Sequence, residues 1–258
     1  MNRPKETETS RRTAMLSVAA GGAVFASGCA AHAAEPPKAT APSSATLPVT
    51  SGIAFAGKNT TQPLPFQATA LKGISDKMIT SHHDNNYAGA VKNLNKVEEE
   101  LSRVTKETPA FVVGGLKQSE LVYRNSATLH ELYFGNLGGE GRANGAIEKV
   151  LGDAYGGFGR WEEIFRATAL SLGGGSGWVV TTWDLHRDVP YTFWSGNHSQ
   201  AFSASTPLLV MDMYEHAYQI DYGAAAAKYI DAFFANVRWD EVNRRLERAR
   251  RAAAVLRS

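Results

Sequence analysis

A run of β-branched and aromatic residues interrupts a chain that is otherwise patterned for helices. Residues 177–184 read Gly-Trp-Val-Val-Thr-Thr-Trp-Asp, and residues 191–194 read Tyr-Thr-Phe-Trp after a turn-rich stretch. Two such runs separated by turn residues predict an antiparallel hairpin. We expect a third short strand before Pro207. A small antiparallel sheet with helical segments before and after it places the chain in the α+β class.

The segment before the sheet predicts two long helices. Across residues 71–105 the apolar residues recur at three- and four-residue spacing, and Ser75 is a suitable N-cap. A second helix is expected at about 117–134, because four glycines follow between residues 135 and 141. Two consecutive helices of this kind would form an antiparallel helical hairpin.

Helical patterns return on both sides of the strands. Residues 144–172 favour short helices broken at Gly156 and Gly157. Residues 211–256 favour helix again, with a charged and solvated face at 244–251. No GxGxxG or Walker pattern occurs in the sequence, so a phosphate-binding loop is not expected.

These patterns divide the chain into four expected regions. Residues 1–34 are expected to be an export signal and residues 35–60 a disordered linker, since residues 35–50 are rich in Pro, Ala, Ser and Thr without apolar periodicity. Residues 61–142 are expected to form the helical hairpin domain. Residues 143–258 are expected to form a C-terminal α/β domain with a three-stranded antiparallel sheet.

The first 34 residues have the composition of a targeting segment. Arg11 and Arg12 precede a short apolar run at residues 14–27, and small residues surround His32. Twin arginines, a short apolar region and a small-residue cleavage site predict export by the twin-arginine route. The run is too short to span a membrane as a stable helix. We therefore expect a periplasmic or otherwise exported protein.

A single cysteine, Cys29, lies inside this leader. The mature protein would then contain no disulfide and no cysteine-ligated metal. The alternative is that Cys29 is lipidated after cleavage before it, although the preceding Ala26-Ser27-Gly28 fits a lipoprotein site only loosely. Contact with a membrane is expected only in that alternative.

The charge balance gives no indication of a nucleic-acid partner. The chain has 27 Lys and Arg against 25 Asp and Glu, and removal of residues 1–34 leaves 23 of each. Nucleic-acid-binding proteins show a basic excess on one face. The apolar fraction of 43% is sufficient for a substantial core.

Asp212 and His216 are four residues apart in a segment that is expected to be helical. Residues at i and i+4 share one face of a helix, so a carboxylate and an imidazole would lie side by side. Taken alone, such a pair is more often a surface or capping pair than part of a metal site.

The other histidines favour the metal site. The chain has seven histidines; His82 and His83 fall on the first expected helix, and His130 falls on the second among apolar neighbours. A lone histidine there would more often be a hydrogen-bonded core residue, but three imidazoles with one carboxylate indicate a metal ligand set. Nitrogen and oxygen donors without a thiolate suit manganese, iron or zinc, and they disfavour a structural zinc site.

Several motifs make the chain similar to the iron/manganese superoxide dismutases over about residues 61–250. The matching segments are Gln62-Pro63-Leu64-Pro65-Phe66, Ala90-Val91-Lys92-Asn93-Leu94-Asn95, Gly175-Ser176-Gly177-Trp178 and Asp212-Met213-Tyr214-Glu215-His216-Ala217-Tyr218. The last segment is close to the family pattern D-x-[WF]-E-H-A-[FY] and is the most specific of the four.

The resemblance implies a metal centre and an activity. The implied ligands are His82, His130, Asp212 and His216, holding one iron or manganese ion per chain with solvent as the fifth ligand; His83 is implied to be non-ligating. The implied reaction is dismutation of superoxide to oxygen and hydrogen peroxide. Two alternatives are a non-catalytic metal-binding or structural protein on the same fold, and another metal-dependent redox or hydrolytic enzyme.

The resemblance also implies residues around the ion. His198 falls where the family places a residue that hydrogen-bonds the metal-bound solvent; otherwise it is an ordinary turn histidine. Trp178 is expected to line the catalytic cavity with Trp183, Tyr133 and Phe134, a role compatible with ordinary core aromatics.

Other family features concern the assembly. In the family, the glutamate at Glu215 crosses a dimer interface to the ligand histidine of the other subunit. We therefore expect a homodimer with Glu215 and His216 at its interface, or a tetramer.

Four positions depart from the family pattern. Ala90 replaces the gateway tyrosine, Asn86 the gateway histidine, Gln219 an interface tyrosine and Ala226 an arginine near the funnel mouth. We hypothesise that Asn86 and Gln219 form an amide–amide hydrogen bond across the dimer, and that Tyr87 partly refills the space at Ala90.

Overall fold

Residues 52–257 are described by a computed structural model, and they belong to one unit that begins at Thr46. The expected export signal, Cys29 and the first part of the expected linker lie outside the described residues and stay predictions. Within the described range, the linker prediction needs shortening. Gly57 and Asn59 are hydrogen-bonded to Glu98 and Asn95 on the first long helix.

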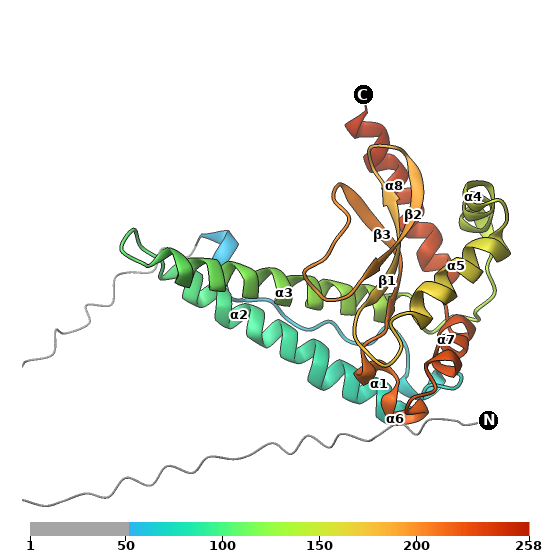
Figure 1. The fold of residues 1–258 in the computed structure, drawn as a ribbon, viewed down its shortest axis with the longest axis horizontal. Coiled ribbons are helices and arrows are strands. Elements are labelled where there is room, and N and C mark those ends of the chain that lie inside the picture. The colour runs from blue at the N-terminus through green and yellow to red at the C-terminus, as the bar shows by residue number, and fades with distance from the viewer. Residues whose placement is uncertain (1–51, 258) are drawn as a thin grey trace, which may run out of the picture. The chain divides into compact units, whose positions relative to one another are not determined.

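The helical hairpin is present (Figure 1). Its first arm consists of α1 (Asp76–Ser81), a π-helical turn η3 (His82–Tyr87) and α2 (Ala88–Ser102); its second arm is α3 (Ala110–Gly135). Ser75 is the N-cap of α1, as predicted, and its side chain accepts a hydrogen bond from the Met78 amide. The second arm begins earlier than predicted because Gly114 and Gly115 do not end the helix.

Short segments with little regular structure precede the hairpin. They contain two single 3-10 turns, η1 (Ile53–Phe55) and η2 (Ala68–Ala70). The expected first helix therefore starts at Asp76 and not near Leu71. Leu71 and Ile74 are nevertheless buried, so their apolar spacing reflects packing in the core and not a helix.

The predicted break at two glycines is confirmed. Helix α4 (Gly145–Tyr155) ends and α5 (Phe158–Leu170) begins across Gly156 and Gly157, whose φ angles are 76° and 141°. Glycine adopts positive φ without the steric cost that a Cβ brings.

Three antiparallel strands form the sheet in the order β2-β1-β3. The strands are β1 (Trp178–Asp184), β2 (Val189–Ser195) and β3 (Ser205–Asp212). Every residue of the central strand β1 is buried. The third strand runs through Pro207, whereas we expected it to end before this residue. Pro207 is tolerated because β3 is an edge strand and its register with β1 shifts between Thr181 and Thr182.

The expectation of helix from residue 211 is wrong at its start. Strand β3 continues to Asp212, and a 3-10 turn η4 (Glu215–Ala217) follows. The helices after it are α6 (Gln219–Tyr222), α7 (Ala226–Ala235) and α8 (Trp239–Leu256). A short apolar run such as residues 208–211 has no periodicity that separates a buried strand from a buried helix.

One buried cation joins three elements near the sheet. The Arg245 guanidinium on α8 donates to the carbonyls of Leu132 on α3 and Leu208 on β3, at 3.0 and 3.1 Å. The Asn136 side chain, at the end of α3, accepts from the Val210 amide at 2.9 Å. These bonds fix the C-terminal part of α3 against β3, the two elements that carry His130 and Asp212.

None of the helices between residues 52 and 257 combines the length and apolarity that crossing a bilayer requires.

Candidate metal centre

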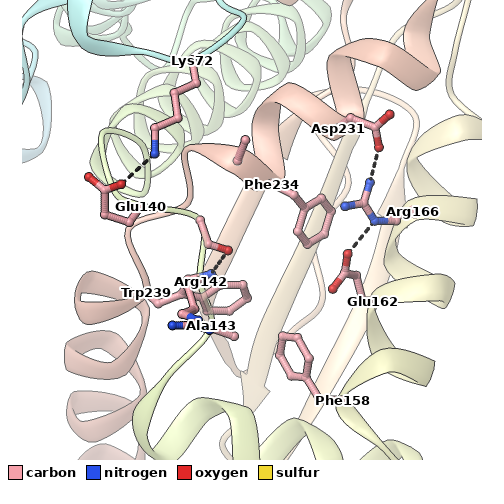
Figure 2. Close-up of a pocket in the computed structure, with 12 residues that line it drawn as sticks. Lys72, Glu140, Arg142, Ala143, Phe158, Glu162, Arg166, Asp231, Phe234 and Trp239 are labelled. Atoms are coloured by element: carbon pink, nitrogen blue, oxygen red, sulfur yellow. Dashed lines mark hydrogen bonds and ion pairs between the residues drawn. The ribbon is translucent and has the colours of Figure 1, made fainter.

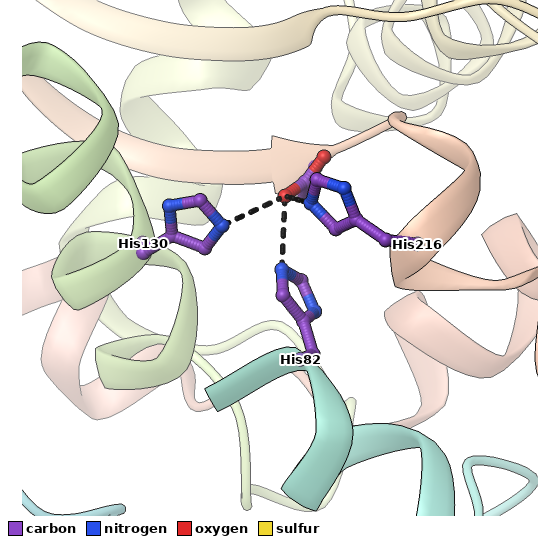
Figure 3. Close-up of side chains that lie close together, drawn as sticks. His82, His130 and His216 are labelled. Carbon is purple, nitrogen blue, oxygen red and sulfur yellow. Dashed lines mark hydrogen bonds and ion pairs between the residues drawn. The ribbon is translucent and has the colours of Figure 1, made fainter. Parts of the chain in front are cut away.

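Four elements bring the predicted ligands together (Figure 3). His82 is the first residue of η3, His130 lies on α3, Asp212 ends β3 and His216 lies in η4. The expectation that Asp212 and His216 share one face of a helix is therefore wrong. The chain instead leaves the sheet at Asp212 and turns back through η4, so that His216 faces the end of the strand.

The donor atoms converge on one carboxylate oxygen. Asp212 Oδ2 lies 3.0 Å from His82 Nε2, 3.2 Å from His216 Nε2 and 3.6 Å from His130 Nε2. One donor atom from each of the four residues lies within 4.8 Å of all the others. Ligand bonds of about 2.1 Å place neighbouring donors about 3 to 4 Å apart, so the cluster has the dimensions of a first coordination sphere.

Hydrogen bonds outside the cluster orient its side chains. His130 Nδ1 donates to the Ser126 carbonyl at 2.7 Å, which leaves Nε2 as the lone-pair nitrogen. Asp212 Oδ1 accepts from the Tyr214 amide at 2.8 Å, and the Tyr229 hydroxyl donates to the Asp212 carbonyl. Ligand histidines and carboxylates are commonly held in this way by a second set of partners.

An unpartnered nitrogen supports a metal at this place. Among the described residues, His130 Nε2 is buried and has no hydrogen-bond partner, and the same holds for His82 Nδ1. A buried polar atom without a partner costs free energy. Coordination of an ion would satisfy His130 Nε2, which points at the cluster (Figure 3).

The protonation states also fit metal binding. Burial lowers the pKa of His130 to about 3, with a further contribution from His82, and burial likewise lowers the pKa of His82. Burial alone would raise the pKa of Asp212, but the adjacent His216 and His82 imidazoles hold that pKa below its usual range. Near neutral pH His82 and His130 are therefore neutral and Asp212 is ionised, which are the forms that bind metal.

Comparisons with known proteins match both parts of this chain. A model of the iron/manganese superoxide dismutase α-hairpin domain matches residues 58–138, and a model of the C-terminal domain matches residues 143–245.

Three relatives illustrate the similarity. A superoxide dismutase [Fe] of Cupriavidus metallidurans is 41% identical over 189 residues, which cover 73% of this chain and 96% of the relative. The chain belongs to the iron/manganese superoxide dismutase family. A superoxide dismutase [Fe] of Saccharolobus solfataricus is 31% identical over 72% of this chain and 92% of the relative. Superoxide dismutase [Mn] 1 of Halobacterium salinarum is 32% identical over 72% and 94%.

His198, the outer-sphere residue that the family resemblance implies, lies beside the cluster. It sits in the loop between β2 and β3, and its ring centroid is 6.3 Å from that of His130. Trp178 Nε1 donates to His198 Nδ1 at 3.0 Å, and Asn125 donates to the His198 carbonyl. The indole donor leaves the imidazole proton on Nε2.

Tyr214 is a site residue that the sequence reasoning did not single out. Its ring is stacked between two imidazoles, with centroids 4.6 Å from His198 and 5.3 Å from His216. The only signal in the sequence is its position in the family pattern, where a tryptophan or phenylalanine is usual. Tyrosine keeps the stacking surface of those residues and adds a hydroxyl.

The expected aromatic wall is partly confirmed. Tyr133 and Phe134 are buried with ring centroids 5.1 Å from His82, and Trp178 lies 5.1 Å from His130. Trp183 is at the other end of β1, where its indole donates to Asp188 at 3.0 Å. It belongs to the core and not to the metal cavity.

Tyr87 only partly fills the space that Ala90 leaves. Its ring is buried 6.2 Å from the His130 ring, but its hydroxyl donates to Glu131 and accepts from the Gln62 amide, both at 2.8 Å. Burial raises the pKa of Tyr87 to about 12. The hydroxyl is therefore committed to these partners and is not directed at the ligands.

His83 is turned away from the cluster, as the resemblance implies. Its ring nitrogens contact the Asp84 carboxylate at 2.7 Å and the Gln62 carbonyl at 2.8 Å. Both nitrogens are thus occupied by groups outside the ligand set.

A separate hollow of about 470 Å³ lies between residues 140–143, α5, α7 and the start of α8 (Figure 2). Five of its charged side chains form ion pairs: Lys72 pairs with Glu140, and Arg166 pairs with both Glu162 and Asp231. It contains none of the four clustered ligands, and we assign it no chemistry.

Proposed function

We propose that this protein dismutates superoxide to oxygen and hydrogen peroxide with one iron or manganese ion per chain. One observation carries the proposal: three imidazoles meet a single buried carboxylate oxygen at 3.0 to 3.6 Å in a chain of the iron/manganese superoxide dismutase family. Relatives named for iron and relatives named for manganese both match the chain. The proposed cofactor is therefore either iron or manganese.

His82, His130, Asp212 and His216 would hold the ion. A bound iron or manganese ion supplies one-electron chemistry through its trivalent and divalent states. Asp212 adds a negative charge next to the three imidazoles, and this charge favours the trivalent state of the ion. The buried rings of Trp178, Tyr133 and Phe134 exclude bulk water and restrict entry to small molecules.

His198 would hold and donate a proton beside the ion. Because Trp178 donates to Nδ1, the proton of the neutral imidazole lies on Nε2, where it can be donated to solvent or product in the cavity. Tyr214 holds the ring plane by stacking. Production of hydrogen peroxide consumes protons, so a fixed donor at this place supports the reaction.

Metal analysis combined with a dismutation assay tests this function. We expect iron or manganese in the purified protein and superoxide-dependent activity. Asp212→Ala should lose both, because it removes the carboxylate that all three imidazoles contact. Asp153→Ala, at an exposed carboxylate on α4, should keep both. A protein that contains only zinc, or metal without activity, would contradict the proposal.

We propose further that the protein is a homodimer or a tetramer with Glu215 and His216 at the interface. Glu215 and Gln219 are exposed in the single chain, and His216 is partly exposed, which leaves these side chains accessible to a second copy. Sedimentation of the protein and of Glu215→Ala tests the idea. We expect the variant to dissociate more readily, whereas an unchanged assembly would contradict this interface.

Export by the twin-arginine route is also a proposal, supported by the arrangement of residues 10–33. Fractionation of cells that express the full chain tests it. We expect activity in the periplasm or medium, and its loss there when Arg11 and Arg12 are changed to lysine.

A further inference from the structure

The last helix extends beyond the part of the chain that resembles the family. The C-terminal family model ends at residue 245, but α8 continues to Leu256. The additional segment is about three helical turns long. In Figure 1 the C-terminal end of α8 lies at the top of the view and α1 lies at the bottom. The ligand His82 directly follows α1 in the chain. A partner bound at this end would leave the metal centre accessible.

All the basic residues of this helix are arginines. Residues 238–257 contain seven arginines, no lysine and three acidic residues. The remainder of the chain has 20 Lys and Arg against 22 Asp and Glu, from totals of 27 and 25. The near-neutral net charge therefore conceals a basic helix on a slightly acidic protein.

The two halves of α8 use their arginines differently. In the first half, Arg244 and Arg245 pair with Glu241. In the second half, the Arg248 side chain has no ion pair or hydrogen bond with any residue from 52 to 257, and Arg250 lies over the Trp183 ring at 5.2 Å without a carboxylate partner.

The exposed face of the second half is basic and ends in apolar residues. Arg244, Arg248 and Arg251 are spaced four and three residues apart and share one face, opposite the buried Ala249 and Ala253. Among residues 52–257, the only ion-pair partner of Arg251 is Glu247, one turn away on the solvent side.

Large apolar side chains are exposed at the end of the same helix. The exposed fractions of Val255 and Leu256 are 74% and 67%. Beside them, an open groove lined by Leu246, Arg250 and Ala254 runs toward the start of α4. Apolar side chains at a basic tip are costly in water, so this tip has the composition of a surface that binds a partner.

We propose that the second half of α8 binds the surface of a membrane that contains anionic phospholipids. Arginine forms two parallel hydrogen bonds with a phosphate, and a basic helix with exposed apolar residues is suited to the headgroup region. Nucleic acids also carry phosphates that arginine can bind, but they have no hydrocarbon region that could bury exposed aliphatic side chains. The exposed Val255 and Leu256 therefore favour a lipid surface over a nucleic acid. The expected export would bring the protein to such a surface.

Vesicle sedimentation tests the proposal. The probes are vesicles of phosphatidylcholine alone and of phosphatidylcholine mixed with phosphatidylglycerol. The metal-loaded chain begins at Glu35, because this keeps all the described residues and the apolar leader would itself bind lipid. We expect binding to the mixed vesicles only, and we expect it to weaken as salt is added.

Three variants identify the residues responsible. Arg248→Ser with Arg251→Ser should weaken binding to the mixed vesicles by about tenfold. Leu256→Ser should weaken it by a smaller factor. The matched control, Lys106→Ser with Lys149→Ser, removes two exposed charges elsewhere and should bind as the parent does. All variants should keep helical content and dismutase activity, since these side chains lie outside the metal centre.

Three results would overturn the proposal. The first is equal binding to neutral and anionic vesicles, and the second is an arginine variant that binds as tightly as the lysine control. The third is binding to DNA or heparin but not to vesicles, with no effect of Leu256→Ser. That result would assign the helix to a soluble polyanion instead of lipid.

Discussion

At the scale of single residues, the site depends on which nitrogen of each histidine is free. The Ser126 carbonyl accepts a hydrogen bond from the Nδ1–H of His130, and the Trp178 indole donates a hydrogen bond to Nδ1 of His198. In both cases Nε2 is left for chemistry, as a lone pair in His130 and as a donor in His198. Residues that never touch the ion thus determine what the imidazoles can do.

Replacing Trp178 should affect turnover more than metal content. Trp178→Phe removes the indole donor to His198 but keeps most of the ring. Loss of one hydrogen bond of about 1 kcal/mol should lower turnover about fivefold. Pulse radiolysis and metal analysis measure the two effects. Trp183→Phe is the matched control, because it loses a 3.0 Å bond to Asp188 far from the ion; equal loss of turnover in both variants would contradict the role of Trp178.

The metal-free protein should lose stability as pH falls from 6.5 toward 3. The pKa of His130 is about 3 and that of His82 is also lowered, whereas an unfolded imidazole titrates near 6.5. Over this range the unfolded state binds protons that the folded state does not bind. The free energy of unfolding should therefore fall by about 1.4 kcal/mol per pH unit for each such histidine.

Urea unfolding of the metal-free protein at a series of pH values measures this slope. His130→Gln should reduce it, because one of the buried imidazoles is removed. A free energy of unfolding that stays constant between pH 6.5 and 4 would show that these histidines are not buried and neutral.

At the scale of elements, turns and breaks place the ligands. The π-helical turn η3 begins at His82, and β3 stops at Asp212. A π-helical turn changes the direction of the side chains that follow it, and such turns often occur at functional sites. The break between α4 and α5 carries no ligand, but it shows the same dependence on a turn: two glycines let the chain change direction before the sheet.

Gly157 should be the least replaceable residue of that break. Its φ of 141° is a conformation that L-residues rarely adopt, although no atom lies within 4 Å of an added Cβ. Gly157→Ala should therefore destabilise the protein by about 1 to 3 kcal/mol through backbone strain alone.

Gly159→Ala is the control, since Gly159 lies inside α5 and also has open space around an added Cβ. It should stabilise the protein by roughly 0.5 to 1 kcal/mol. Urea denaturation of both variants measures the difference, and similar stabilities would contradict the strain argument.

At the scale of the whole molecule, Arg245 connects the helical hairpin to the C-terminal domain. Its guanidinium reaches carbonyls on α3 and β3 from α8. Gly135 makes this approach feasible, because a Cβ there would lie 2.6 Å from Arg245 Nη2. The bonds hold His130 and Asp212 in their relative positions from a distance.

Arg245→Leu should destabilise the protein by about 3 kcal/mol, because it removes the buried cation that donates to the Leu132 and Leu208 carbonyls and that pairs with Glu241. Arg103→Leu, at an exposed ion pair near the end of α2, should change stability by less than about 0.5 kcal/mol. Thermal and urea unfolding measure both. Equal effects would show that Arg245 is not the connection we describe.

Much of this arrangement was predictable from local pattern. The α+β class, the helical hairpin, the N-cap at Ser75 and the break at Gly156 follow from spacing and turn chemistry over a few residues. The first and last residues of the helices and strands were harder to predict. Residues 208–211 are apolar throughout, and only pairing with β1 makes them a strand.

The sequence by itself determined the set of donors: few histidines, one aspartate four residues before the last of them, and no cysteine after residue 29. Only the tertiary structure decided that they meet, because His82 and Asp212 are 130 residues apart. It also decided that Asp212 ends a strand and that Tyr214 lies between two imidazoles. Local pattern reports the interactions of neighbours along the chain, whereas a metal centre is made by contacts between distant elements, which depend on how the whole core packs.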